Sequence, residues 1–546
     1  MPKVVAVMLS FEAERRMANQ GKNDFEYEEL TKKHKALLRF AISKERKSGM
    51  SVFSLIYPCV TLAKEIDPLA IAKQSDQSSL SSSFFMLEEI KLRLRPLLWH
   101  ATNSIDIDES GPIDETWYWV APLLLDRYNN RQTVEAWLNS TDSKLAWSSM
   151  LKPGSDEDEE SGFSDHIKEF TKFLTSKNRL GRQPKDLLDV MARIALASPA
   201  VTALRSIMRV TRNNEASPAF LAAAAQAGLG FRTLFNQADT ITLLQSITNN
   251  LSDEDKVYWR SILIYNLQGN LQAVLDEYVH VLNESLGLKS HSPEESALKL
   301  GLAIRQAVSI RSPSLRFDEI KLQVSDKSII SDEHRFRCRY AMRFGDEKNE
   351  TYDTGTRDTD VRVAFNSPFR PFILTTTSIG QEGLDFHQYC HRVVHWNLPS
   401  NPVDLEQREG RVHRYKGHVV RRNLAEHYGL KPVVLESHQL IDAWKQLFEC
   451  ARKARLKSDN DLVPYWVYEK GKYKIERMIP VLPLSREIYR LEQLKKSLVT
   501  YRSVIGQPRQ QELLEALNSQ QIIDELQNNN GDILINLSPP SEDISL

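Results

Sequence analysis

Two short apolar runs, each followed by a helical pattern, constrain the fold of this 546-residue chain more than any other feature. The runs are RPFILTTTS at 370–378 and RVVHWNLP at 392–399, and turn residues bound both, as is typical of buried parallel strands. Helical patterns follow them at 381–386 and 403–413. Strand, helix, strand, helix is the layout of an α/β domain with a parallel sheet.

Helical patterns dominate the rest of the chain. Apolar residues recur every three or four positions in much of 24–290 and again after 432, whereas 315–325 and 334–345 alternate in the manner of strands. The acidic run Asp156 to Glu160 favours a solvated linker over a specific acidic binding site. The predicted divisions are an N-terminal helical region (1–153), an acidic linker (154–163), a helical middle domain (164–311), the α/β domain (312–432), a C-terminal helical region (433–520) and a flexible tail (521–546).

Composition and charge limit the classes of function. The net charge is −1, so any contact with nucleic acid must come from a local basic patch. The four cysteines are widely spaced and form no CxxC pair, which argues against a disulfide framework and a cysteine zinc site and favours the reducing cytoplasm. No apolar stretch approaches the length of a membrane span, and the N-terminal apolar run of about six residues is too short for a secretory signal.

The first cluster of candidate functional residues follows the run at 370–378. Ligands bind at the carboxyl ends of strands in open α/β sheets, and TTTSIGQEGLDF at 375–386 occupies that place. Gly380 and Gly383 would let the backbone approach a phosphate or ribose closely. Asp385 could accept hydrogen bonds from ribose hydroxyls.

The second cluster, QREGRVHR, lies at 407–414. Arg411 and Arg414 are three positions apart on a predicted helix, so both guanidinium groups could face one anion such as a γ-phosphate. Taken alone, this spacing fits a solvated arginine-rich helix face better. Between 407 and 422, six cations stand against one carboxylate, and part of this excess could neutralise nucleic-acid phosphates: Arg408, Arg411, Arg414, Lys416, Arg421 and Arg422 against Glu409. Trp396 and Tyr415 are expected in the core or an interface rather than as base-stacking platforms.

Together the two clusters resemble motifs V and VI of superfamily 2 helicases and translocases, in which T…G…GLD is followed some twenty residues later by QxxGRxxR. The segment HWNLPSNPVDLEQREGRVHR looks most like the Swi/Snf branch, which includes the bacterial RNA-polymerase-recycling ATPase. The resemblance implies that the α/β domain is a RecA-like helicase C-terminal lobe embedded between helical domains. It implies that Arg414 is the arginine finger and Arg411 a second γ-phosphate or interdomain contact. It places Gln407, Gly383, Asp385 and Gly410 at the nucleotide, and Thr376, Thr377 and Ser378 along the nucleic-acid backbone.

The parts that hold ATP in such a motor are missing from the sequence. No GxxxxGK[ST] P-loop occurs, and the Gly-Lys pairs at Gly21 and Gly471 lack the preceding glycine and the following Ser or Thr. AVLDEYVHVL at 273–282 imitates a Walker B box, but its apolar spacing predicts an amphipathic helix. A zinc site is disfavoured because alternation along the strand would aim some of its candidate ligands apart: His387, Cys390, His391 and His395.

The resemblance covers about 180–515 and is specific only between about 360 and 420; motif IV is not evident. We expect a cytoplasmic, membrane-independent nucleic-acid-dependent ATPase lobe, acting on DNA in preference to RNA. ATP and Mg²⁺ would be shared with a P-loop lobe on a separate polypeptide, because this chain alone is not expected to hydrolyse ATP. The chain would then be a split or truncated motor. The alternative is a derivative without hydrolysis, acting as a scaffold that binds nucleic acid or protein.

Overall fold

The computed structural model describes residues 36–40, 49–75, 83–103, 105–151, 157–175, 179–247, 251–310, 314–323, 328–337, 354–375, 385–435, 439–456, 461–468, 470–481 and 486–502. Within these ranges, the part of the chain that we call the helical body contains the following elements: η1 (Met50–Val52), α3 (Phe53–Ile56), α4 (Val60–Glu65), α5 (Pro68–Ser75), α6 (Ser83–Thr102), β1 (Asp106–Ile113), α7 (Trp117–Asn129), α8 (Arg131–Leu138), η2 (Trp147–Met150), α9 (Glu157–Thr175), β2 (Arg179–Arg182), α10 (Leu187–Ala197), α11 (Pro199–Thr211), α12 (Pro218–Phe235), α13 (Ala238–Ile247), α14 (Tyr258–Gln268), α15 (Leu271–Ser285), η3 (Leu288–Ser290) and α16 (Pro293–Val308).

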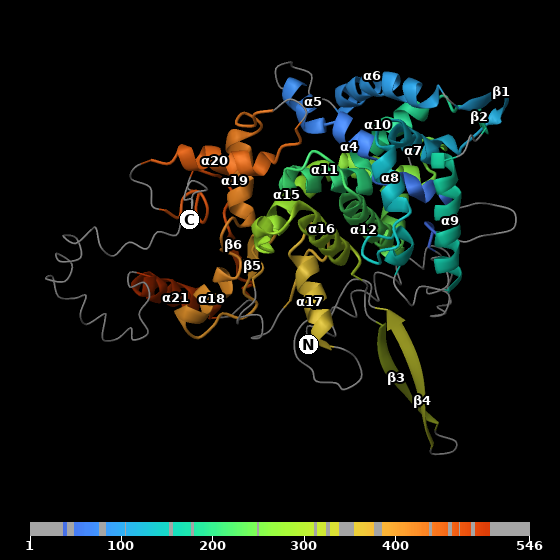
Figure 1. The fold of residues 1–546 in the computed structure, drawn as a ribbon. Coiled ribbons are helices and arrows are strands. Elements are labelled where there is room, and N and C mark those ends of the chain that lie inside the picture. Colours follow the sequence, from blue (N-terminus) through green and yellow to red (C-terminus); the bar gives the residue numbers. More distant parts are fainter. Residues whose placement is uncertain are drawn as a thin grey trace.

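A hairpin and a second group of elements follow the helical body. The hairpin consists of β3 (Ser314–Gln323) and β4 (Ser328–Arg337). We call the described residues from 354 to 481 the C-terminal lobe; its elements are α17 (Thr354–Phe365), β5 (Arg392–Val394), α18 (Pro402–Gly410), α19 (His418–Tyr428), α20 (Ala443–Lys453) and β6 (Glu476–Met478). The helix α21 (Glu487–Arg502) comes after it. Figure 1 shows the hairpin projecting from the molecule, with α18, α19 and α20 on the far side of α15 from α6 and α9.

One continuous cluster of buried apolar side chains fills the helical body, from Leu38 to Val308. Helix boundaries follow local chemistry: Ser292 caps α16 by accepting a hydrogen bond from the Glu295 amide, with proline as the first helical residue. The helices α12 and α16 cross closely because Gly301 lies against Ala223. A Cβ at position 301 would be 2.3 Å from the carbonyl oxygen of Ala223, so only glycine fits there.

The acidic run at 156–160 is not a plain linker. From Glu157 onward its residues form the first turn of α9. Phe163 and Phe170 of the same helix are buried in the core that also contains η1 to α8. The expected regions 1–153 and 164–311 therefore share one core.

The sheets are small, and no embedded RecA-like parallel sheet appears in the described residues. β5 pairs with β6 in parallel over three residues, and β1 pairs with β2 in parallel. The strand pattern at 315–325 is confirmed in β3 as far as Gln323, and the pattern at 334–345 coincides with β4 only over 334–337, the rest lying outside the described residues. The two strands pair as an antiparallel hairpin. The run expected as a strand at 370–378 has no strand in its described part, 371–375. The molecule is thus mostly helical.

In the residues that the structure describes, no single helix has both the length and the hydropathy of a membrane span. The bent pair α10 and α11 meets that criterion by length and composition only, and most of its side chains are buried in the core of the helical body.

Candidate functional site

The sequence QREGRVHR begins on α18, whose start is fixed locally. Asn401 accepts a hydrogen bond from the Asp404 amide at 2.8 Å, and Pro402 is the first helical residue. The helix ends at Gly410, three residues earlier than the sequence predicts. The Arg411 carbonyl accepts a hydrogen bond from the Phe386 amide at 2.8 Å instead of continuing the helical ladder. Arg411 and Arg414 are therefore presented by a turn after the helix, not by one helix face.

The turn after α18 joins the two predicted clusters. The Nε of Arg414 donates to Oδ1 of Asp385 at 3.0 Å, and both side chains are partly open to solvent. Asn366, the residue after α17, holds the backbone of Asp385 in position because its side-chain amide donates to the Asp385 carbonyl at 2.8 Å. Phe386 is buried and packs edge-on against Phe365. The structure thus brings Asp385 and Arg414, 29 residues apart, into direct contact.

Gln407 and Gly410 lie on the last turns of α18. Gln407 is exposed, and a Cβ on Gly410 would meet no atom within 4 Å. Glycine at this position therefore leaves open space beside Arg411, and no packing against the described residues requires it. A ligand could approach the backbone closely here.

Glu409 anchors α18 to β5 and β6. Arg477 on β6 reaches it with both Nε and Nη2, the latter at 2.6 Å, and His395 lies 3.3 Å from it. Burial opposes ionisation of Glu409, but the hydrogen bonds from His395 and Arg477 and the charge of Arg477 lower its pKa to about 2. Glu409 therefore has a structural role, and the parallel pairing of β5 with β6 supports the same anchor.

Two of the six cations between 407 and 422 are not available to phosphates. Arg421 is fully buried; its Nε donates to Glu277 of α15 at 2.6 Å, and its Nη1 donates to the Lys416 carbonyl at 2.7 Å. Lys416 pairs with Glu284 of α15, and its Nζ lies 4.2 Å from the ring centre of Phe448. The local excess of positive charge expected from the sequence is smaller than a count of residues suggests.

The segment that imitates a Walker B box is the helix α15, as its spacing predicts. Its polar residues hold the C-terminal lobe in place. We call three pairs the docking contacts: Glu277–Arg421, Glu284–Lys416 and His280–Asp442, the last at 2.9 Å. Asp276 faces the other way and pairs with Arg209 in the helical body.

The two aromatic residues near the site differ in their surroundings. Tyr415 is an interface residue as expected, stacked on Tyr465 at 5.7 Å between ring centres. Trp396 is 77% exposed, so the expectation that it belongs to the core is wrong. It follows β5 on the chain, beyond the three residues that pair with β6, and among the described residues no further strand pairs with this sheet. Exposed Val394 and Met478, partners across that sheet, share this position.

Several predicted residues lie outside the described residues: Gly383, Thr376, Thr377 and Ser378. Among the residues that the structure does describe, no group of three or more His, Cys, Asp and Glu side chains could hold a metal ion. His395 of the proposed zinc set instead faces Glu409. Sequence reasoning missed Asn366, Arg477, Glu277 and Glu284, because their partners are between 19 and 144 residues away and no local pattern marks them.

Comparisons with known proteins agree with the position of the two clusters. Residues 352–416 match the family model described as the helicase conserved C-terminal domain. A stretch of 114 residues is 29% identical to the "Uncharacterized ATP-dependent helicase YqhH" of Bacillus subtilis (strain 168), and it covers 20% of this chain and 20% of that protein. No solved structure matches the chain significantly. Residues 352–416, which include the contact between Asp385 and Arg414, are thus similar to a helicase C-terminal domain.

Proposed function

We propose that this chain supplies the second motor lobe of a superfamily 2 nucleic-acid-dependent ATPase of Swi/Snf-like type, acting on DNA. The contact between Asp385 and Arg414 carries the proposal, because it joins the residues that match motifs V and VI. The 546 residues contain no P-loop, and the proposal is that a lobe supplied in trans binds ATP. Thr376, Thr377 and Ser378 would lie along the DNA backbone.

The residues around Arg414 suit the terminal phosphates of ATP held by a partner lobe. Arg411 and Arg414 offer two guanidinium groups, Gly410 leaves open space beside them, and Gln407 is exposed on the adjoining helix. The described residues offer no cluster of carboxylates for Mg²⁺, so the metal ion would be held by the partner lobe. ATP would supply the phosphoanhydride that is cleaved, and Asp385 would keep Arg414 oriented until the two lobes close.

The decisive experiment mixes this chain with a candidate P-loop lobe supplied as a separate protein and measures ATP hydrolysis with and without DNA. Arg414→Ala is expected to lower the stimulated kcat by about a thousandfold or more, as expected for loss of an arginine finger. Arg131→Ala is a matched control, because Arg131 is also a partly exposed arginine paired with a carboxylate, Glu135, and lies in the helical body. Undiminished activity in Arg414→Ala would rule out the arginine-finger role.

A second candidate function is a scaffold without hydrolysis, derived from a helicase. It is favoured by one observation, that Arg414 already has a carboxylate partner in the chain itself. The scaffold predicts DNA binding that ATP and the partner protein leave unchanged, and equal behaviour of the Arg414→Ala variant and the parent chain.

A further inference from the structure

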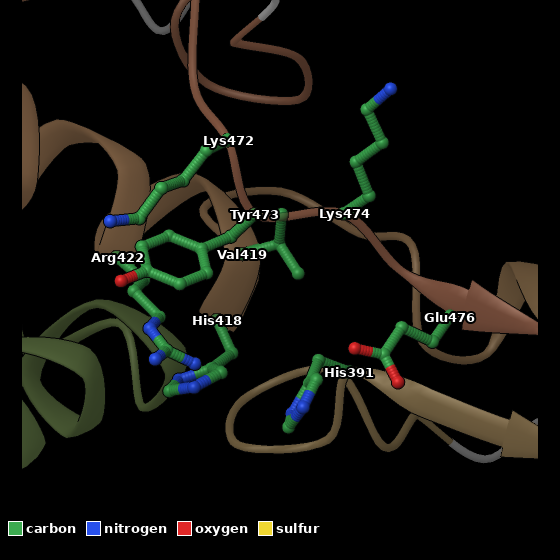
Figure 2. Close-up of a pocket in the computed structure, with 8 residues that line it drawn as sticks. All are labelled: His391, His418, Val419, Arg422, Lys472, Tyr473, Lys474 and Glu476. Atoms are coloured by element: carbon green, nitrogen blue, oxygen red, sulfur yellow. The ribbon is translucent and has the colours of Figure 1, made fainter.

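A pocket of about 180 Å³ lies where the first turn of α19 faces the residues that lead into β6 (Figure 2). His418 and Arg422 line it from α19, and His391 lines it from the position before β5. Lys472, Lys474 and Glu476 line it from the chain entering β6, and the Lys474 side chain extends away from Arg422 at the rim (Figure 2). This pocket does not include Asp385, Arg411 or Arg414. Its lining includes Lys472 of the Gly471-Lys472 pair, which fails the requirements of a P-loop.

The backbone of the pocket is fixed by Asn423, the neighbour of Arg422 on α19. Its side chain donates to the Tyr473 carbonyl and accepts from the Tyr473 amide, both at 2.9 Å. Gly471 packs directly on the same side chain, where a Cβ would lie 2.0 Å from Cγ of Asn423. The Glu476 amide donates to the His391 carbonyl at 2.8 Å on the opposite edge. Both sides of the pocket are thus held in place by hydrogen bonds.

Positive charge exceeds negative charge around the pocket. The only lining carboxylate among the described residues, Glu476, is paired with Arg392 at 2.6 Å. Lys472 is paired with Glu426, whereas Lys474 has no carboxylate partner among the described residues. Counting these two pairing partners, four cations stand against two carboxylates: Arg392, Arg422, Lys472 and Lys474 against Glu426 and Glu476.

Arg422 is oriented by an aromatic ring. Its guanidinium lies 3.7 Å from the ring centre of Tyr473, a cation–π geometry that holds the side chain over the pocket, as Figure 2 shows. His418 lies beside it, and its Nδ1 has no hydrogen-bond partner in the described part of the chain. Burial and the nearby charge of Arg421 lower the pKa of His418 to about 4, so this ring is a neutral hydrogen-bonding group at neutral pH.

We propose that this pocket binds a backbone phosphate of a nucleic-acid strand. A fixed guanidinium, two lysines and a neutral imidazole suit a phosphate with one negative charge, and the volume admits one such group. The preference for a nucleic-acid strand over a free phosphate ion rests on the proposed function. The strand would then contact the chain at a second place, beyond the residues that match motif V.

The test is the salt dependence of binding of a fluorescent single-stranded oligothymidylate, measured by anisotropy. Arg422→Ala and Lys472→Ala are each expected to weaken binding about tenfold at low salt and to reduce the slope of log Kd against log salt by about 0.7. Lys474→Ala gives the same result without disturbing the ring contact of Arg422 or the ion pair of Lys472. Arg422→Lys should restore the slope but not the full affinity.

Lys168→Ala is the matched control, since Lys168 is an equally exposed lysine paired with a carboxylate on α9. If inorganic phosphate binds the parent chain in competition with the oligonucleotide but does not bind the Lys474→Ala variant, the pocket would be a site for a free phosphate ion. The proposal that it binds a nucleic-acid strand would then be wrong. The proposal is also wrong if the three pocket variants keep the parent slope, if Lys168→Ala lowers it as much, or if the parent chain binds no oligonucleotide. ATP hydrolysis with the P-loop partner judges the proposed function separately, because the pocket variants retain Arg414.

Discussion

The helical body buries a continuous apolar core, whereas the C-terminal lobe contains only small apolar clusters. In the lobe, one cluster joins α19 and α20 around Leu424 and Phe448, and another joins α18 to α21 around Leu405. Buried charges supply further contacts: the docking contacts to α15 and the anchor around Glu409. A few apolar side chains of the lobe, among them Phe369, Tyr389 and Leu440, also pack against the core of the body. The body is therefore expected to fold by itself, while the lobe depends on the body for its position. A region with little apolar core of its own is expected to open more readily than one with a continuous core.

The largest expected effect comes from the core of the helical body. Phe53 is fully buried and lies 4.6 Å from Phe170 and 5.3 Å from Trp147 between ring centres. Phe53→Ala should cost about 3–5 kcal/mol of unfolding free energy, because it removes a large side chain and leaves a cavity. Thermal unfolding followed by circular dichroism measures this loss. If Leu405→Ala in the lobe lowered the stability of the whole chain as much, the two regions would not differ as proposed.

A smaller and more local effect is expected from the docking contacts. Arg421→Met removes one partner of a buried ion pair and leaves Glu277 unpaired, which should cost about 3 kcal/mol in the attachment of the lobe. Hydrogen exchange should then increase in α18 and α19 and stay unchanged in α11 and α12.

Two comparison variants sharpen that result. The double variant Arg421→Met with Glu277→Met should recover most of the loss, because no buried charge is left without a partner. Lys256→Ala breaks an exposed pair with Asp253 and should change stability by less than about 0.5 kcal/mol. Equal exchange in the single and double variants would contradict the assignment of the pair.

The smallest expected effect is a difference in acid sensitivity. Burial lowers the pKa of His387 and of His418 to about 4, so the unfolded lobe binds protons between pH 6.5 and 4 that the folded lobe does not. The lobe should lose stability between pH 7.5 and 5 as the histidines of the unfolded lobe become protonated, and Glu409, with a pKa of about 2, extends the loss below pH 4.5.

The helical body contains a group whose effect on stability has the opposite pH dependence. Burial raises the pKa of Asp126, so protonation of this carboxyl favours the folded body as the pH falls. Hydrogen exchange at pH 7.5 and 5, corrected for the intrinsic rate, should show the lobe opening more at pH 5 and the body changing less. Loss of protection in both regions to the same degree would remove the contrast.

The sequence predicted what depends on neighbours along the chain. The amphipathic spacing of 271–282 predicted the helix α15 against its likeness to a Walker B box, and the clusters at 375–386 and 407–414 matched the helicase domain that the family comparison places at 352–416. The start of α18 was predicted within one residue, since proline and an asparagine cap mark it locally.

Contacts between distant residues could not be predicted in this way. β6 has three residues and lies 84 positions after β5, so no alternation identifies it. The partner of Arg421 is 144 positions away on a helix whose own pattern does not specify it. The early end of α18 is likewise a tertiary effect, because the backbone amide of Phe386 donates a hydrogen bond to the Arg411 carbonyl. The prediction that Trp396 is buried was wrong because, among the described residues, the sheet formed by β5 and β6 has no further strand beside this side chain.

The position of β6 affects how this lobe could be moved between proteins. A fragment that ends with the family match at residue 416 would lose Arg477, the cation that neutralises Glu409 on α18. The carboxylate would then remain beside His395 without its strongest partner, and the turn that carries Arg414 would lose its support. A graft or a gene fusion therefore needs the chain to extend at least to Met478, which is 62 residues beyond the end of the family match. The stable structural unit is longer than the segment that the family model matches.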